Sequence, residues 1–344
     1  MKMIDVSVII PVYNVEAYVE ACLRSVMEQE HGGFNVECII VDDRGQDGSM
    51  DVVRRTLDTY KGDIEFKIIE HDENRGLSAA RNTAIRAVRG KYVTFLDSDD
   101  RLLPGALAGM YQLTVKYPGV DIVQGNTRLD KENEYLRSAL EISPARLLEF
   151  IPNSSEAKHL LLFDMPVTAW AKLIRRDFIT SSNIYYTEGM VHEDDMWDIC
   201  ASRYIRTLAF YFSYVYYYNN DIENSITQKS DKTRSLLGRI ALIPRAAECY
   251  EQEPCIDYYD YLMRRLDFVN KSELWASVRD RKIVRKAISE MRKNIAKSNC
   301  PLPIRLAALY FTLPNLIGSN RFILPAFRRF SGLLKRYYIR KLKK

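Results

Sequence analysis

The chain has 344 residues, of which 50 are Lys or Arg and 45 are Asp or Glu. A hydrophobic content of 47% and a charged content of 28% are usual for a globular protein and exclude a disordered or fibrous chain. The basic charge gathers at the C-terminus, because residues 301–344 contain ten basic and no acidic residues, while the preceding 300 residues carry 40 basic and 45 acidic ones. This mildly acidic body argues against a nucleic-acid-binding protein.

The first half of the sequence predicts alternating strands and helices. Continuous apolar, β-branched runs are typical of strands buried on both faces, and we expect strands at residues 6–11, 36–41, 64–69, 92–96 and 120–124. Helical spacing of apolar residues predicts helices at residues 17–28, 48–60 and 77–88, and Pro104 opens a fourth. This order predicts an α/β fold, with a Rossmann-like, mainly parallel sheet and helices on both faces.

The second half predicts a strand, a set of helices and a basic tail. We expect a strand at residues 210–218 and helices at residues 235–250, 259–269 and 281–295. The predicted organisation is therefore an α/β domain over residues 1–225, a helical extension over 226–300 and an amphipathic tail over 301–344.

Residues 322–337 of that tail carry apolar side chains at three- and four-residue steps with Arg and Lys between them. This pattern predicts a helix lying on an anionic membrane surface. A helix docked on the acidic body or on a partner subunit is the alternative.

The expected compartment follows from three further features. The apolar run at the N-terminus is too short for a signal peptide, and no stretch of about 20 apolar residues follows it. The six cysteines show no CxxC pairing, which favours reduced thiols in a cytosolic protein. Together with the basic tail, they predict a cytoplasmic protein, peripheral on the inner face of the cell membrane.

Polar residues follow the predicted strands at the point where ligands bind in open α/β sheets. Asp42 and Asp43 follow the second strand, and Asp97, Asp99 and Asp100 follow the fourth. Neither a GxGxxG nor a GxxxxGK[ST] phosphate loop is present. Acidic strand ends repel phosphate unless a divalent cation intervenes, so we predict a metal-bridged diphosphate.

Asp97 and Asp99 project to the same side if the extended chain continues. They could then share Mg²⁺ or Mn²⁺ with positions left open for diphosphate oxygens. Capping of the helix near Pro104 is the alternative for these residues, and for Asp100 the two interpretations are equally favoured.

Five segments in this order resemble a known family: SVIIPVYN (7–14), VDDRGQDGS (41–49), NRGLSAARN (74–82), FLDSDD (95–100) and HEDDMW (192–197). They resemble the family 2 inverting nucleotide-sugar glycosyltransferases of GT-A fold over about the first 220 residues. Processive members carry a Gln-x-x-Arg-Trp motif and transmembrane helices, and neither is found here. The resemblance therefore implies a non-processive hexosyltransferase that adds one sugar per encounter.

The resemblance also implies residue roles on the donor side. Pro11, Tyr13 and Asp43 would hold the nucleoside, with Tyr13 stacking on the base and Asp43 accepting a hydrogen bond from its ring N–H. Arg75 and Arg81 would lie near the diphosphate or pair with the acidic cluster.

For the metal, the same resemblance makes Asp99 the direct ligand of Mn²⁺ or Mg²⁺. Asp97 would reach the ribose or the metal. A metal that bridges the diphosphate neutralises the charge of the leaving group.

On the acceptor side, the resemblance makes Asp194 the general base that deprotonates the attacking hydroxyl, and Glu193 orients it. The alternative is that these acids only stabilise the start of a helix by interacting with its dipole. Asp195 is a weaker candidate for the base. His192 could contact the diphosphate or metal, or be simply solvated. Further acceptor contacts are predicted for Trp197, although a tryptophan on an amphipathic helix more often packs in the core, and for Lys172.

The sequence therefore predicts an inverting, metal-assisted enzyme that moves one sugar from a UDP-sugar to a saccharide or lipid-linked saccharide in surface polysaccharide synthesis. A sugar nucleotidyltransferase is an alternative, but the glycine-rich phosphate loop that it needs is absent. A non-catalytic module that binds sugar nucleotides or membranes is another, and release of UDP from a UDP-sugar would distinguish it.

Overall fold

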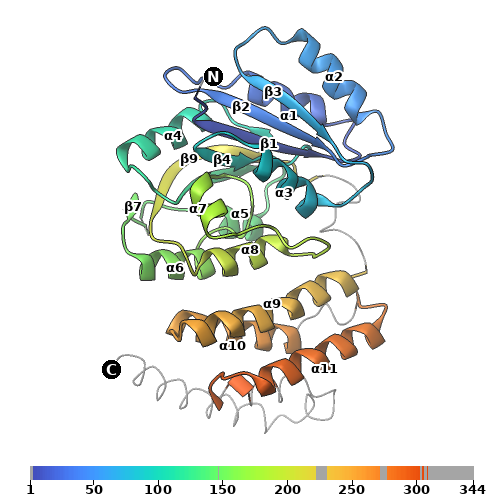
Figure 1. Cartoon of the computed structure of the whole chain (residues 1–344), viewed down its shortest axis with the longest axis vertical. Helices are drawn as coiled ribbons and strands as arrows, with labels where there is room; N and C mark the ends of the chain where they lie inside the picture. The colour runs from blue at the N-terminus through green and yellow to red at the C-terminus, as the bar shows by residue number, and fades with distance from the viewer. Residues whose placement is uncertain are drawn as a thin grey trace. The chain divides into compact units, whose positions relative to one another are not determined.

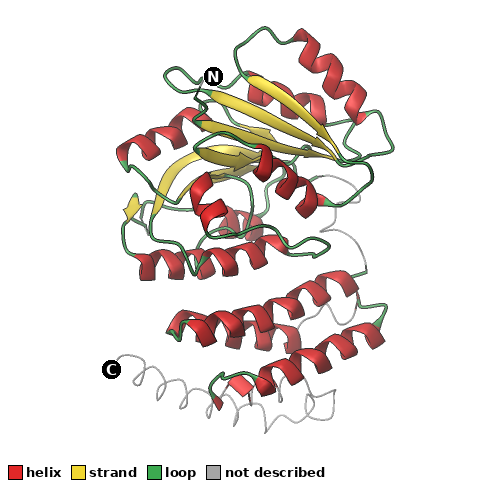
Figure 2. Ribbon diagram, in the orientation of Figure 1, coloured by secondary structure: helices red, strands yellow, loops and turns green. Residues whose placement is uncertain are grey.

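The computed structural model describes residues 3–145, 147–221, 231–271 and 277–302, with residues 304, 305 and 308. The chain divides into two compact units, Met1–Glu223 and Asn224–Lys344. The first is an α/β unit and the second is helical in its described part, which confirms the predicted fold class (Figure 2). The predicted amphipathic pattern at residues 322–337 lies outside the described residues.

One mixed sheet forms the centre of the first unit (Figure 1). Its strands are β1 (Val6–Val12), β2 (Val36–Asp42), β3 (Glu65–Glu70), β4 (Tyr92–Phe95), β5 (Arg101–Leu102), β6 (Ile122–Leu129), β7 (Phe150–Ile151), β8 (Lys172–Arg175) and β9 (Leu208–Tyr218). They lie in the order β3-β2-β1-β4-β8-β6-β9-β5, with β7 on β9. Strands β1 to β4 are parallel, as predicted, whereas β8 runs antiparallel to both of its neighbours.

Strand β1 lies at the centre of the parallel part. It pairs with β2 from Val6 opposite Val36 to Val12 opposite Asp42, and with β4 from Val6 opposite Tyr92. Because these parallel strands run in register, their carboxyl ends meet at one edge of the sheet. The segments that follow Val12, Asp42 and Phe95 are therefore neighbours in space.

Helices cover both faces of the sheet. Alternate β1 residues point to opposite sides, so that Val8 and Ile10 join the core on one face and Ile9 joins the core on the other. The first face packs against α1 (Val19–Met27), α2 (Ser49–Thr59), α4 (Ala106–Lys116) and α5 (Glu134–Leu140). The second packs against α3 (Leu77–Ala87), α6 (Ser154–Phe163), α7 (Arg176–Ser181) and α8 (Glu193–Ala201).

In the second unit, α9 (Thr233–Gln252) contacts both α10 (Ile256–Lys271) and α11 (Arg281–Lys297). Within the described residues, no helix is both long enough and apolar enough to cross a membrane. None of the six cysteines, all of which lie within the described residues, forms a disulfide bond.

Candidate active site

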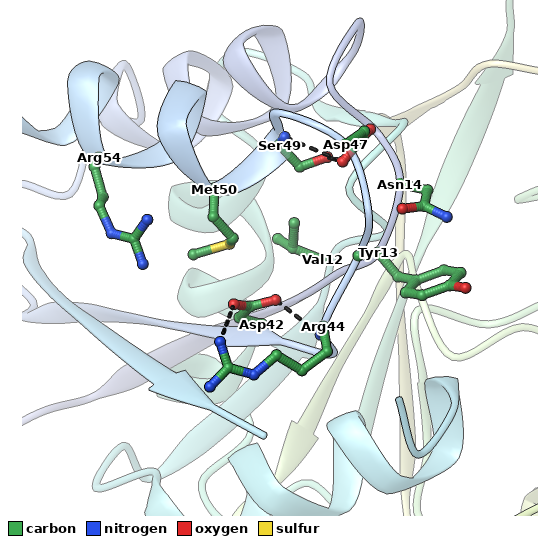
Figure 3. Close-up of a pocket in the computed structure, with 10 residues that line it drawn as sticks. Val12, Tyr13, Asn14, Asp42, Arg44, Asp47, Ser49, Met50 and Arg54 are labelled. Atoms are coloured by element: carbon green, nitrogen blue, oxygen red, sulfur yellow. Dashed lines mark hydrogen bonds and ion pairs between the residues drawn. The ribbon is translucent and has the colours of Figure 1, made fainter. Parts of the chain in front are cut away.

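A pocket of about 190 Å³ opens at the carboxyl ends of β1 and β2 (Figure 3). Its lining comes from three elements: Val12, Tyr13 and Asn14 at the end of β1, Asp42 and Arg44 at the end of β2, and Met50 and Arg54 on α2. The Asp42 carboxylate accepts a hydrogen bond of 2.9 Å from the backbone N–H of Arg44. The pocket therefore combines an exposed aromatic ring, the two carboxylates of Asp42 and Asp47, and two guanidinium groups.

The neighbouring Asp43, which was predicted to hold the nucleoside, is not among the residues that line this pocket. It is 2% exposed. Its Oδ1 accepts hydrogen bonds from His71 Nδ1 at 2.7 Å and the N–H of Arg75 at 2.8 Å, and its Oδ2 accepts one from the N–H of Gly76 at 2.8 Å. Asp43 thus fixes the loop that carries Arg75, whereas Asp42, which is 4% exposed, and Asp47 are the carboxylates that line the pocket.

Tyr13 is among the residues that line the pocket, and Pro11 is not. The Tyr13 ring is 46% exposed and lines the pocket, where a base could stack on it. Pro11 is buried in β1 opposite Val41 and lies outside the lining, and its contact with a nucleoside stays a prediction. Asn14 and Arg44 adopt positive φ angles of 52° and 56°, a strained conformation for non-glycine residues that tends to gather at functional sites.

The acidic segment after β4 is fixed by a tyrosine of β9. The hydroxyl of Tyr216 donates to Asp100 Oδ2 at 2.6 Å and accepts a hydrogen bond from the N–H of Asp97 at 3.2 Å. The N–H of Asn219 donates to the other oxygen of Asp100 at 2.8 Å. Asp100 therefore holds the segment in place, and the interpretation that it caps the following helix is wrong, because α4 has Gly105 at its N-cap and no side-chain cap.

The carboxylates of this segment lie close together. Burial and the neighbouring Asp97 raise the pKa of Asp99 to about 6. Burial, Asp99 and Asp97 raise the pKa of Asp100 to about 8. Repulsion of this kind is relieved when a cation binds between the carboxylates.

Arg81 of α3 joins this segment to α8. Its side chain is 1% exposed, and its Nη2 donates to Asp97 Oδ1 at 3.0 Å. Its Nη1 lies 3.0 Å from Glu193 Oε1 and 3.2 Å from Asp194 Oδ1. Burial lowers the pKa of Arg81, but Asp97 and Asp194 outweigh burial and raise it above its ordinary value. The structure thus places Arg81 in the acidic cluster, the second of its two predicted positions.

The next residue of α3 positions the segment that leads into α8. The Asn82 side chain donates to the carbonyl of Tyr186 at 2.8 Å and accepts from the Tyr186 N–H at 2.9 Å. Its Nδ2 also lies 3.3 Å from Glu188, which in turn pairs with Arg75 at 3.3 Å. Arg75 and Glu188 are both partly exposed.

Helix α8 begins with three acids, Glu193, Asp194 and Asp195, whose negative charge suits a helix N-terminus. Burial raises the pKa of Asp194 to about 7, with Arg81 opposing that rise and Glu193 adding to it. Asp194 remains partly exposed, whereas Asp195 is buried. His192 precedes the helix in the left-handed region, with φ of 67°; its contact with a diphosphate or metal stays a prediction.

The structure contradicts the acceptor contacts predicted for Trp197 and Lys172. Trp197 is 3% exposed and stacks on Tyr186 with ring centroids 6.1 Å apart, so the core interpretation holds. Lys172 is fully buried, and its Nζ donates to the carbonyl of Pro166 at 3.0 Å and also to that of Thr168. Both side chains support the site from within the core.

Three contributors were missed by sequence reasoning. Asn82 lies inside a quoted segment, beside Arg81, and Glu188 lies in a loop whose shape the sequence does not reveal. Tyr216 is one of several aromatic residues on β9, and no sequence signal separates it from the others.

The comparisons with known proteins agree with this geometry. The family model described as Glycosyl transferase family 2 matches residues 7–180. EpsH of Bacillus subtilis, named as a glycosyltransferase, is 30% identical over 235 residues, which are 67% of this chain and 65% of EpsH. TuaG of the same organism, named for teichuronic acid biosynthesis, is 42% identical over 96 residues, 28% of this chain and 36% of TuaG. The matches thus span less than two thirds of these relatives.

Solved structures show the same fold at low identity. TarS of S. aureus, in complex with UDP, superposes with a TM-score of 0.64 at 16% identity, covering 90% of this chain and 87% of that one. The mannosyltransferase PcManGT of Pyrobaculum calidifontis, in complex with GDP-Man and Mn²⁺, gives a TM-score of 0.56 at 17% identity over 97% and 84% of the two chains. With half of its length matched by the family model, this chain belongs to glycosyl transferase family 2.

Proposed function

We propose that the protein is an inverting glycosyltransferase that transfers one hexose from a nucleotide-sugar donor to a saccharide or lipid-linked saccharide in surface polysaccharide synthesis. One observation carries this proposal: the guanidinium of Arg81 contacts Asp97 from the strand end and Asp194 from α8. A donor-side carboxylate and a candidate base thus both contact the buried guanidinium of Arg81.

The donor that fits best is a UDP-sugar. A carboxylate in the pocket can accept a hydrogen bond from a ring N–H such as that of uracil, and Asp42 is in place for this role. Tyr13 would stack on the base. TarS, whose title names complexes with UDP and UDP-GlcNAc, supports this donor class, and the exposed guanidinium of Arg75 would meet the diphosphate.

The residues after β4 fit a divalent cation. Within the described part of the chain, no three His, Cys, Asp or Glu side chains form a ready-made metal site. Mg²⁺, however, commonly binds through one or two carboxylates together with substrate phosphates. Asp99 and the Asp97 oxygen not bonded to Arg81 are such a pair, and they would hold Mn²⁺ or Mg²⁺. When bound, the cation would neutralise charge on the leaving diphosphate.

Asp194 would act on the opposite side of the sugar. A base is most effective when its pKa lies near the working pH, and burial brings the pKa of Asp194 to about 7. It would accept the proton of the attacking hydroxyl, while Arg81 holds its carboxylate and Glu193 in place. Attack from the face opposite the leaving diphosphate inverts the anomeric carbon.

Two further observations concern the acceptor and the site of action. The name of TuaG, which refers to teichuronic acid biosynthesis, supports an acceptor in surface polymers. The basic composition of residues 301–344 supports action at the inner face of the cell membrane, through the anionic lipid surface.

Nucleotide release tests the proposal. Wild-type protein with Mn²⁺ is incubated with UDP-, GDP- and dTDP-sugars in turn, and the free nucleotide is measured with and without saccharide acceptors. We expect release of UDP. The Asp194→Asn variant should bind donor normally but transfer about 100-fold or more slowly. Full activity of this variant would overturn the assignment of the base.

A further inference from the structure

The last described helix of the second unit has two opposite faces of different chemistry. The buried side of α11 consists of Val284, Ile288, Met291 and Ile295, which recur at steps of four, three and four residues. Because α11 contacts α9, these four apolar side chains attach α11 to the helical unit. Asp280 caps the helix through hydrogen bonds from the N–H groups of residues 282 and 283.

The opposite side of α11 is a lysine stripe, defined here as Lys282, Lys286, Lys293 and Lys297. All four are exposed, and at 3.6 residues per turn they fall within about 60° of the helix circumference. Among the described residues, none of their ammonium groups forms an ion pair with a carboxylate. The stripe is therefore a row of solvated positive charges on a helix held firmly by its other side.

The length of the stripe indicates the size of its ligand. Lys282 and Lys297 are fifteen residues apart, which is about 22 Å along a helix with a rise of 1.5 Å per residue. A single phosphate meets one or two of these groups, whereas a surface of many anionic groups meets all four. The helix carries seven basic residues against one acidic residue, Glu290.

The second unit as a whole is basic, as α11 is. Residues 224–344 contain 26 basic and 10 acidic residues, while residues 1–223 contain 24 basic and 35 acidic ones. The chain after α11 combines basic residues with Phe, Leu and Ile, and has no acidic residue from 301 onward. This composition suits a lipid surface better than a soluble polyanion, because the apolar side chains then enter the interface.

We propose that the lysine stripe of α11 binds the anionic headgroups of a phospholipid membrane. These lysines precede the predicted amphipathic tail in the chain, and the proposal is independent of the donor chemistry. Each Lys close to an anionic surface strengthens binding by about fivefold. The stripe alone therefore makes a measurable contribution to partitioning of the full chain.

Vesicle sedimentation tests this proposal with the full chain. We expect binding to vesicles of phosphatidylcholine and phosphatidylglycerol, weaker binding in high salt, and little binding to phosphatidylcholine alone. Replacement of all four stripe lysines by Gln should lower binding at least about tenfold. The matched control replaces four exposed basic residues of the first unit, Arg55, Lys61, Lys67 and Lys91, by Gln, and should bind as the wild type does.

A second variant keeps the test decisive if the first fails to fold. Glu290→Lys adds a positive charge beside the stripe and should strengthen binding by about fivefold. Wild-type binding by the four-Gln variant, or no effect of Glu290→Lys, overturns the proposal, as does equal binding to uncharged vesicles. Stripe-dependent binding to soluble polyphosphate without vesicle binding would overturn it in favour of a polyanion. UDP release, measured in the same samples, reports separately on the proposed function and should not change.

Discussion

Asp97 and Asp194, which are 97 positions apart in the chain, share one buried guanidinium: Arg81 Nη2 lies 3.0 Å from Asp97 Oδ1, and its Nη1 lies 3.2 Å from Asp194 Oδ1. The end of β4 and the start of α8 are thereby held at a fixed separation. Arg81 also lies 5.1 Å from the ring centroid of Tyr186, so aromatic packing supports its position.

Replacing Arg81 should destabilise the protein strongly. Arg81→Met leaves Asp97, Glu193 and Asp194 without their shared cation, and removing one partner of a buried ion pair costs about 3–5 kcal/mol. Arg81→Lys keeps the charge but lacks the planar guanidinium that reaches both Asp97 and Asp194. This variant should therefore lose stability, but less than Arg81→Met. Urea denaturation of the three proteins measures the free energies of unfolding. Equal stability of Arg81→Met and the wild type would contradict the role of Arg81 as the link.

The transfer rate should depend on the ionisation of Asp194. Burial raises the pKa of this carboxyl to about 7, and only the deprotonated form can accept the proton of the acceptor. At saturating donor and metal, the rate should therefore rise from about pH 6 to about pH 8 and then level off. A rate that stays constant across this range would show that Asp194 is not the titrating base.

Asp42 and Asp43 should respond differently to the same substitution. Asp42→Asn changes the pocket carboxylate and should weaken UDP binding by about tenfold with little loss of stability, because it removes a charge-assisted hydrogen bond. Asp43→Asn disturbs the bonds to His71 and to two backbone N–H groups and should lower stability. Calorimetric titration with UDP and thermal melting separate the two effects. The opposite pattern would return the nucleoside contact to Asp43.

A buried carboxylate far from the site should show in the pH dependence of stability. Burial tends to raise the pKa of Glu37, but hydrogen bonds from Ser7 and Arg89 outweigh it and lower the pKa below 4.5. The carboxylate therefore stabilises the fold fully above pH 4.5, and this contribution is lost as the pH falls through the lowered value. Glu37→Gln should be less stable than the wild type at pH 7, with a gap that narrows in acid. A gap independent of pH would contradict the lowered pKa.

The sequence predicted the first four strands because each is a short segment rich in apolar, β-branched or aromatic residues that lies between helical patterns. It missed β5 and β7, which have two residues each and owe their strand geometry to pairing with β9. It also missed β8, whose four residues include a buried lysine. Such short elements are set by tertiary contacts that no local pattern encodes.

The sequence also predicted a part of the candidate site. The strand ends and the start of α8 were found, because acidic residues at such positions are conspicuous. The sequence does not distinguish Asp42 from Asp43 as the nucleoside contact, since adjacent residues of a strand point to opposite faces and the sequence does not say which face holds the ligand. The contacts of Arg81 with Glu193 and Asp194 could not be predicted either, because they join residues more than 100 positions apart.

The central claim is that the sugar donor lies between Asp99 and Asp194. Its most direct test is the crystal structure of the protein with a UDP-sugar and Mn²⁺, in which the anomalous signal locates the metal. The account predicts manganese bound to Asp99 and to the diphosphate, with the anomeric carbon facing the carboxylate of Asp194. Manganese away from Asp99, or a sugar remote from Asp194, would contradict it.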